Sequence, residues 1–540
     1  MTRSSVDDEG VVPRARRARR PEAESEAEVA GGRRRTSGHR RRTDQASPRP
    51  KRRILRWSAL TLSVVILGTA GAGYLYYQHL NANIKKDKLN LGDSDVPQAT
   101  PNAAGQTPLN VLLIGSDSRN TTKDLKLGGS KADVGRPPLA DVQMLVHVSA
   151  DRSNMSVVSL PRDTMIPIPK CTDPHTGHVY PASTLAMAND SLGRGGPGCT
   201  VATWQHLTKI HIDHFMMVDF SGVVDMADAI GGVPVCVQQN VWSHTSDGHG
   251  SGLKLKKGTT YVEGQQALQW LRTRYGFEDG TDLGRTHAQH MYMNAMVRQL
   301  RENATLSNPG KMRSLAETAT KALQVDESLG TIKKLYDLSE EFKKVPTKRI
   351  TMTTLPTVQW VQNHNRLVPA PQDSDQLLSM VRDDTPLDGR GAKHKTDQKS
   401  KDPAAADDRI AVQVRNGTGA DGQTPVPQRA GAIAQVLQGK GFTEAAKDAT
   451  AAAEAKTTLL YPSADLEGDA QAVAKALGVP LKQVRKSTDV SGVTLVVGAD
   501  WRTGDAYKAA AEPTAAPTSA AVLHGDKKDA CMAIQKGFTW

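Results

Sequence analysis

One apolar segment near the N-terminus constrains this chain more than any other feature. The 21 residues from Trp57 to Tyr77 carry no charged side chain, and Leu, Val, Ile and Ala predominate among them. A helix of that length spans about 30 Å, the thickness of the hydrocarbon core of a membrane. Trp57 at one end and Tyr74, Tyr76 and Tyr77 at the other suit the two membrane interfaces. The segment predicts one transmembrane helix over residues 57–77.

The segment before this helix, residues 1–56, is strongly basic. It holds 17 Arg and Lys against eight Asp and Glu, a net +9 of the chain's +12. Positively charged residues keep their side of a transmembrane helix in the cytoplasm. The chain is therefore expected to be a single-pass protein of the cell membrane, with the residues after the helix outside the cell. The arginines follow no aromatic or amphipathic period, which favours a disordered cytoplasmic tail and no nucleic-acid partner. A signal peptide cleaved near Ala70-Gly71-Ala72 is the alternative, but such peptides rarely follow a long hydrophilic segment.

All four cysteines follow the apolar segment: Cys171, Cys199, Cys236 and Cys531. None belongs to a C-x-x-C pair, which disfavours zinc, and a position outside the cytoplasm favours disulfides. We expect the pair Cys171–Cys199 first, because the 27 residues between them are rich in Pro, Gly and His, a long excursion that a bridge would hold. Cys236 and Cys531 would then pair by elimination.

Composition and periodicity divide the rest of the chain into two folded regions and polar connections. Residues 78–108 are polar with several prolines and are expected as a stalk, and residues 383–408 are expected as a linker. Strand-like apolar runs alternate with segments of helical spacing in residues 109–370 and again in 409–500. This alternation predicts an α/β domain followed by a smaller one. The Ala-, Pro- and Thr-rich residues 501–540 are expected as a low-complexity tail.

Charged side chains stand at the ends of three predicted strands of the first domain. They are Asp117, Arg119, Asp141, Arg162 and Asp163. Ligands of α/β sheets bind beyond the carboxyl ends of strands, so the groups that follow the first and third of these strands should converge. Four more polar residues lie in later segments of helical spacing: Arg272, Arg274, Arg285 and Gln289. Arg285 and Gln289 are four residues apart and share one face of a helix.

Two carboxylates with four or five guanidiniums suit a magnesium-bound pyrophosphate ester. Arginines bind phosphate oxygens bidentately, and one or two carboxylates suffice for a Mg²⁺ ion that keeps water and phosphate as its other ligands. The alternative for each motif alone is a set of surface salt bridges and helix caps. Zinc is disfavoured because no Glu or third ligand completes either pair of histidines: His175 with His178, and His287 with His290.

Five blocks of the first domain form a specific pattern. They are residues 110–119 (NVLLIGSDSR), 157–164 (VVSLPRDT), 212–220 (IDHFMMVDF), 230–234 (IGGVP) and 264–274 (GQQALQWLRTR). In order and spacing they resemble the LytR-CpsA-Psr family, over residues 109–303. The resemblance implies a three-layer α/β/α domain with a central mixed sheet and an apolar channel for a lipid tail. Residues 409–500 resemble the LytR C-terminal domain, through the Asn416-Gly417-Thr418 turn and the helix after it.

Enzymes of this family transfer glycopolymers from a polyprenyl-pyrophosphate carrier to peptidoglycan. The resemblance therefore implies a membrane-bound phosphotransferase of cell-wall assembly that forms a phosphodiester link. By position, Asp117 and Asp141 match its Mg²⁺ ligands, and six residues match its pyrophosphate-binding side chains: Arg119, Arg162, Arg272, Arg274, Arg285 and Gln289. Asp163 is a candidate general base, or a group that orients Arg162. The expected catalytic set is Asp117, Asp141, Arg162 and Asp163.

One block departs from the family pattern. Where the family usually has Arg-Ser-Asp-Thr, this chain has Leu139-Ala140-Asp141-Val142, so the aspartate survives without its companion arginine. Arg136 is close enough in sequence to substitute for it. Two alternatives use the same residues or fold: a hydrolase that cleaves the prenyl pyrophosphate with water, and a non-catalytic regulator of the cell envelope.

Overall fold

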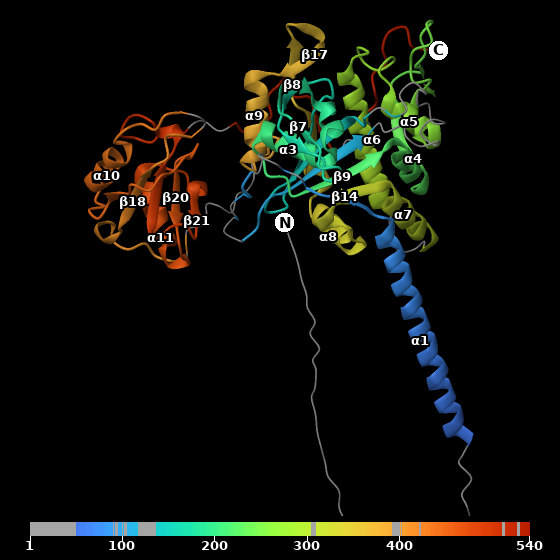
Figure 1. Ribbon diagram of the computed structural model, residues 1–540, viewed down its shortest axis with the longest axis horizontal. Coiled ribbons are helices and arrows are strands. Elements are labelled where there is room, and N and C mark those ends of the chain that lie inside the picture. The colour runs from blue at the N-terminus through green and yellow to red at the C-terminus, as the bar shows by residue number, and fades with distance from the viewer. Residues whose placement is uncertain are drawn as a thin grey trace, which may run out of the picture. The chain divides into compact units, whose positions relative to one another are not determined.

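The computed structural model describes most of the chain after residue 49 (Figure 1). The described ranges are 50–89, 91, 96–99, 101, 105–116, 135, 137–303, 309–390, 400, 402–420, 423–509, 513–525 and 530–540. Residues 1–49 of the expected basic tail lie outside them, as do Asp117, Arg119 and Arg136. The chain divides into two compact units, residues 1–70 and 71–540, each of which is described by itself.

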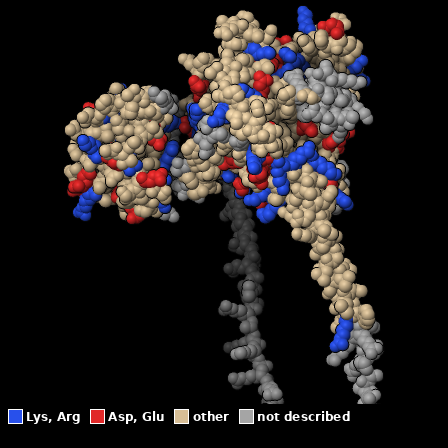
Figure 2. Space-filling view, viewed as in Figure 1, with Lys and Arg blue, Asp and Glu red and all other residues tan. Residues whose placement is uncertain are grey.

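The first helix, α1 (Pro50–Asn83), extends beyond the predicted span at both ends. Its stretch Leu55–Asn83 is long and apolar enough to cross a membrane, and Figure 2 shows the surface of α1 largely free of charged side chains. The last turn of α1 belongs to the second unit. There His79 and Asn83 contact Glu317 of α7 (Pro309–Ala322) at 3.2 and 3.4 Å.

The second unit is built on an eight-stranded mixed sheet. In spatial order its strands are β1 (Lys85–Asp87), β14 (Leu323–Asp326), β9 (His214–Asp219), β2 (Leu109–Ser116), β3 (Ala140–Val148), β4 (Met155–Ser159), β15 (Ile350–Thr354) and β23 (Val522–His524). β2 runs parallel to β9 and antiparallel to β3, and β4 runs parallel to β15. β2, β3 and β4 are the three strands whose ends carry the charged residues singled out in the sequence.

Alternate residues of the central strands face two separate cores. On β2, Val111 packs into one core, whereas Leu112 and Ile114 pack into the other. The first core is covered by α4 (Phe220–Ala229), α5 (Gly264–Arg272), α6 (Asp282–Asn303), α7 and α8 (Ile332–Lys343), and the second by α3 (Gly196–Thr208) and α9 (Pro371–Arg382). The sheet is therefore the middle of three layers, which confirms the expected α/β/α fold. Because α9 packs on the sheet, this domain continues past residue 370.

Five short pairs of antiparallel strands lie outside the large sheet in the described part of this domain. They are β5 (Met165–Ile168) with β8 (Ser183–Met187), β6 (Cys171–Thr172) with β7 (Val179–Tyr180), β10 (Val233–Val237) with β13 (Gly258–Val262), β11 (Val241–Trp242) with β12 (Lys254–Leu255), and β16 (Thr357–Trp360) with β17 (Asn363–Pro369). The sulfur atoms of Cys171 and Cys199 lie at bonding distance in this region, as do those of Cys236 and Cys531.

Two segments expected outside the domain supply the edges of its sheet. Part of the expected stalk forms β1, which pairs with β14, and part of the expected low-complexity tail forms β23, which pairs with β15. An edge strand of three residues needs only one row of backbone hydrogen bonds and little apolar alternation, so its sequence carries a weak signal. Beyond β23 the chain runs along β10, where Met532 N–H donates to the Cys236 carbonyl at 2.8 Å.

The smaller C-terminal domain has a five-stranded sheet in the order β19 (Ala446–Lys447), β18 (Val412–Asn416), β22 (Val493–Val497), β20 (Thr458–Tyr461) and β21 (Val484–Lys486). α10 (Arg429–Gly439) and α11 (Glu467–Leu477) share its core. The turn after β18 is held by side chains. Thr418 Oγ1 donates to Asn416 Oδ1 at 2.6 Å and accepts from Val426 N–H at 2.8 Å.

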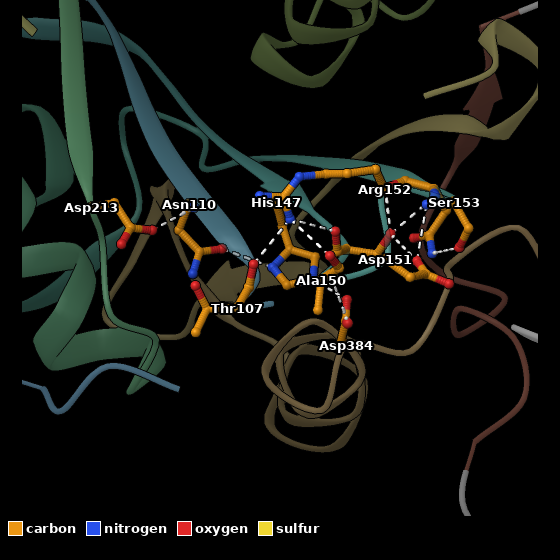
Figure 3. A network of polar contacts seen from close by, with 11 residues as sticks. Thr107, Asn110, His147, Ala150, Asp151, Arg152, Ser153, Asp213 and Asp384 are labelled. Atoms are coloured by element: carbon orange, nitrogen blue, oxygen red, sulfur yellow. Dashed lines mark hydrogen bonds and ion pairs between the residues drawn. The ribbon is translucent and has the colours of Figure 1, made fainter. Parts of the chain in front are cut away.

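A polar network lies where β2 begins and the neighbouring strand β3 ends (Figure 3). His147 is 3% exposed, and its ring nitrogens contact Asn110 Oδ1 at 2.7 Å and Asp384 Oδ1 at 2.9 Å. Asp384 Oδ2 also accepts from Ala150 N–H at 2.9 Å. Arg152 donates to Glu341 and to three backbone carbonyls nearby. We call this the far end of the two strands.

Candidate active site

Several of the predicted charged residues that the structure describes lie at the opposite end of the same strands, which we call the near end. Ser116 at the end of β2 pairs with Ala140 at the start of β3, and β3 pairs with β4 through Met144 and Ser159. These registers place the end of β2, the start of β3 and the end of β4 side by side, and the prediction concerned the ends of β2 and β4. Arg162, two residues beyond Leu160, reaches back to β3, where its Nη1 donates to Asp141 Oδ1 at 3.0 Å.

Two helices bring further charges to the near end. α6 starts with Asp282, and Arg285 one turn later contacts it, with Nη2 2.5 Å from Asp282 Oδ1. Arg274, two residues after α5, has its Nε 4.0 Å from the same oxygen, and Arg162 has its Nε 3.9 Å from it. Three guanidiniums from three different elements therefore converge on one carboxylate oxygen. Asp282 and Arg285 each have side chains only 9% exposed.

The near end is rich in buried polar atoms without hydrogen bonds. Among the described residues, five buried atoms lack a hydrogen-bond partner: Nε of Arg162, Arg274 and Arg285, and both carboxylate oxygens of Asp282. The contacts of the three arginines with Asp282 are therefore ion pairs without hydrogen bonds. A buried polar group left unbonded costs about 1–3 kcal/mol, and more when it is charged. Three guanidinium groups gathered around one carboxylate suit a ligand that supplies several anionic acceptor oxygens.

Burial and charge act differently on two of these arginines. Burial alone would lower the pKa of Arg162, but Asp141, Asp163 and Asp282 together outweigh it and raise that pKa. The pKa of Arg285 is lowered, because its deeper burial outweighs Asp282, and because Arg162 and Arg274 repel it. An anion bound between these guanidiniums would offset the burial of Arg285.

The remaining predicted residues take different positions. Asp163 lies beside Arg162, with Oδ1 3.7 Å from its Nε, and Arg272 ends α5 half-buried. Gln289 is 6% exposed and donates to the Leu271 carbonyl at 3.1 Å, so its amide ties α6 to the end of α5. Leu139, which stands where the family usually has arginine, is 9% exposed and brings no charge.

The histidines do not assemble a zinc site in the described part of the chain. His287 Nδ1 contacts Glu278 at 2.6 Å, whereas His290 Nε2 contacts Ser159 Oγ at 2.5 Å. Burial lowers the pKa of His290 to about 3, and His287 adds to that shift. Among the described residues no three His, Cys, Asp or Glu side chains form a group that could hold a metal.

Sequence reasoning did not single out Asp282, the centre of the cluster. A signal for it existed, since an acidic residue at the start of a helix is stabilised by the helix dipole and faces a residue three positions later. Asp282 precedes Arg285 by three residues and follows the loop Gly280-Thr281. Both features are local and visible in the sequence.

The C-terminal segment also supports the near end, and no local signal predicts this. Gln535 holds Gly276 from both sides, since its Oε1 accepts from Gly276 N–H at 2.8 Å and its backbone N–H donates to the Gly276 carbonyl at 3.0 Å. Glu278 N–H donates to the Ala533 carbonyl at 3.0 Å. The segment therefore braces the loop that connects Arg274 with Asp282.

Comparison with known proteins identifies related sequences. The profile of the LytR_cpsA_psr family matches residues 73–382, and that of the LytR cell envelope-related transcriptional attenuator matches residues 409–501. The cell wall biosynthesis protein LcpA of Corynebacterium glutamicum is 26% identical over 82% of this chain and 85% of its own. The polyisoprenyl-teichoic acid–peptidoglycan teichoic acid transferase TagV of Bacillus subtilis is 26% identical over 56% of this chain and 72% of its own.

A solved structure, the LytR-Csp2A-Psr enzyme from Actinomyces oris, aligns at 20% identity with a TM-score of 0.40, over 55% of this chain and 96% of that one. The family assignment follows from the profile instead, which spans more than half of the sequence. The chain belongs to the LytR-CpsA-Psr family.

Proposed function

We propose that this protein transfers a glycopolymer from a polyprenyl-pyrophosphate carrier to peptidoglycan and forms a phosphodiester link. The supporting observation is the convergence of three guanidiniums on Asp282 at the near end, whose buried Nε atoms lack hydrogen bonds among the described residues. A diphosphate has enough oxygens to accept from all three. Relatives named as peptidoglycan teichoic acid transferases favour the same chemistry.

The reaction needs no protein nucleophile. A sugar hydroxyl of peptidoglycan attacks the phosphorus on the polymer side of the diphosphate. The bond between that phosphorus and the bridging oxygen breaks, and lipid phosphate leaves with the bonding electrons. Arg162, Arg274 and Arg285 hold the diphosphate and interact more strongly with the leaving phosphate as its charge grows. We assign the same role to Arg272 and to Arg119. Asp282 keeps the three guanidiniums together before the donor arrives.

The proton of the attacking hydroxyl requires an acceptor. Asp163 is the candidate by position, although its contact with Arg162 at 3.7 Å also suits a group that orients the arginine. Asp141 has carboxylate oxygens of the type that Mg²⁺ prefers, and among the described residues Arg162 donates to its Oδ1, so Asp141 together with Asp117 would hold the ion. Bound Mg²⁺ would neutralise charge on the diphosphate.

We also infer where the reaction takes place. α1 crosses the cell membrane with the basic N-terminal segment in the cytoplasm, and residues after it lie outside, where carrier lipid and wall are both in reach. Both cysteine pairs would then be disulfides, as an oxidising compartment permits. Peptide mapping of the unreduced protein should find Cys171 linked to Cys199, and Cys236 linked to Cys531. A free thiol at Cys171 would contradict this.

The proposed reaction is tested with the full-length chain in detergent. Radiolabelled glycan on polyprenyl pyrophosphate is supplied with Mg²⁺ and purified peptidoglycan, and label is followed into the insoluble wall fraction. Arg162→Ala should abolish the transfer. Arg194→Ala is the matched control, because the exposed hydrogen bond of Arg194 goes to the Pro181 carbonyl and not to a residue of the cluster.

Three outcomes separate the alternatives. Label in the wall, lost in Arg162→Ala only, supports the transferase. Release of lipid phosphate without label in the wall identifies a hydrolase instead. Donor binding without any release leaves a non-catalytic envelope protein and contradicts the proposal.

A further inference from the structure

Exposed aromatic rings lie on the β11–β12 hairpin, directly after Arg274 and in the C-terminal segment. Trp242 and Tyr275 are each 42% exposed, and Trp540 is 46% exposed. Phe, Trp and Tyr make up only 4% of the chain, so a group of exposed rings on one surface calls for a binding role. We call these three residues, together with His244 and Phe538, the aromatic surface.

The rings are held in place before any ligand binds. Trp242 stacks on His244 with centroids 4.8 Å apart. Lys254 Nζ lies 5.0 Å from the Trp242 centroid and 4.4 Å from that of Trp540, so one cation fixes both indoles. The Trp540 indole N–H donates to the Val241 carbonyl at 3.1 Å. Pre-ordered rings lose little entropy when a ligand binds.

The aromatic surface is continuous with the candidate active site. Tyr275 directly follows Arg274 and stacks on Phe538, with centroids 6.4 Å apart. The hairpin is bonded to the same loop, since Ser251 Oγ and Thr273 Oγ1 lie 2.6 Å apart. A ligand on these rings would therefore lie next to the guanidiniums that hold the diphosphate.

We propose that the aromatic surface binds the sugar rings of a peptidoglycan strand, the acceptor of the reaction. This inference rests on the proposed function. The donor has a diphosphate for the arginines to hold, whereas the acceptor's glycan chain has none and needs a surface of its own. Pyranose rings present C–H groups on their faces, which pack on Trp and Tyr while their hydroxyls stay in water. Binding there brings an acceptor hydroxyl close to the phosphorus.

Cosedimentation of the full-length chain in detergent with purified peptidoglycan, stripped of attached polymers and without donor, measures this binding. Trp242→Ala and Tyr275→Ala should each weaken it by about 3- to 10-fold, the amount expected for one ring contact. Tyr336→Ala is the matched control and should bind like the wild-type chain. Tyr336 is 61% exposed on α8, and Lys343 Nζ lies 5.7 Å from its ring.

Further arms separate sugar recognition from other causes. Trp242→Leu and Tyr275→Leu keep apolar bulk without the ring and should lose binding equally, while a melting temperature like that of the wild-type chain excludes misfolding. Soluble β-1,4-linked N-acetylglucosamine oligomers should compete, and strands freed of stem peptides should still bind. Wild-type affinity in the Trp242 and Tyr275 variants, or binding that needs the stem peptides, overturns the proposal. Because donor is absent, failure of transfer in the earlier assay leaves this result unaffected.

Discussion

The two ends of β2 and β3 carry similar polar side chains but differ in how many of these have hydrogen-bond partners. At the far end, both ring nitrogens of His147 and both oxygens of Asp384 have partners, and Arg152 donates to four acceptors (Figure 3). At the near end, the buried Nε atoms of Arg162 and Arg285 have no hydrogen-bond partner within the described part of the chain. Folding alone favours satisfied polar groups, so the unsatisfied end is the one arranged for a ligand. Substitutions should therefore affect stability at the far end and activity at the near end.

Arg285→Ala should lower the activity strongly and leave the stability almost unchanged. Loss of one buried cation beside the leaving phosphate should lower the transfer rate by about 10²–10³-fold. The melting temperature should change little, because Arg162 and Arg274 remain beside Asp282 and still compensate its charge. Rate and melting temperature are measured on the same preparation. Loss of stability without loss of rate would reverse the roles of the two ends.

Asp384→Ala should show the opposite behaviour at the far end. It removes the Asp384 oxygens that contact the Ala150 N–H and Nε2 of the buried His147 ring, which should cost about 2–3 kcal/mol of stability. Transfer measured well below the melting temperature should stay near the wild-type rate. Asp373→Ala serves as a control, since Asp373 lies on α9 with an exposed contact to Ser519. An unchanged melting temperature in Asp384→Ala would remove the contrast between the ends.

His290 extends the comparison to pH, because it is buried and neutral beneath the near end. Its folded-state pKa is about 3, below the unfolded value of about 6.5, so the unfolded chain binds the extra proton first as pH falls. Its stabilising contribution is complete above pH ~6.5 and declines toward pH ~3, by about 2 kcal/mol at pH 5. Urea unfolding at pH 7 and pH 5 should therefore show a smaller pH dependence in His290→Gln. Equal pH dependence in both proteins would mean that His290 is protonated in the fold.

Gln535→Ala should have the smallest effect and tests whether the C-terminal segment matters for the near end. It removes one of the two hydrogen bonds to Gly276 and should reduce transfer by about 5-fold, since one neutral hydrogen bond contributes about 1 kcal/mol. A looser loop should raise the KM for the donor more than it lowers kcat. The control is Lys536→Ala, because Lys536 is an exposed neighbour. A fall in kcat with unchanged KM would argue against a positioning role.

Local sequence determined a large part of this protein. The uncharged run before Tyr77, the strand–helix alternation and the charged residues after Leu160 are short-range patterns, and the fold and family follow from them. The convergence of Arg162 with Asp141 was predictable too, because the ends of neighbouring strands meet at one edge of a sheet.

Only the tertiary structure decided which polar groups became buried without partners. Arg274 and Asp282 come from different elements, and their approach depends on how α5 and α6 pack on the sheet. The two hydrogen bonds between Gln535 and Gly276 join segments more than 250 residues apart. Periodicity reports each residue's immediate neighbours along the chain, whereas such contacts depend on the summed packing of every element between them. The residues near Ala533 are therefore expected from the sequence as part of a low-complexity tail, whereas in the fold they hold the loop that connects Arg274 with Asp282.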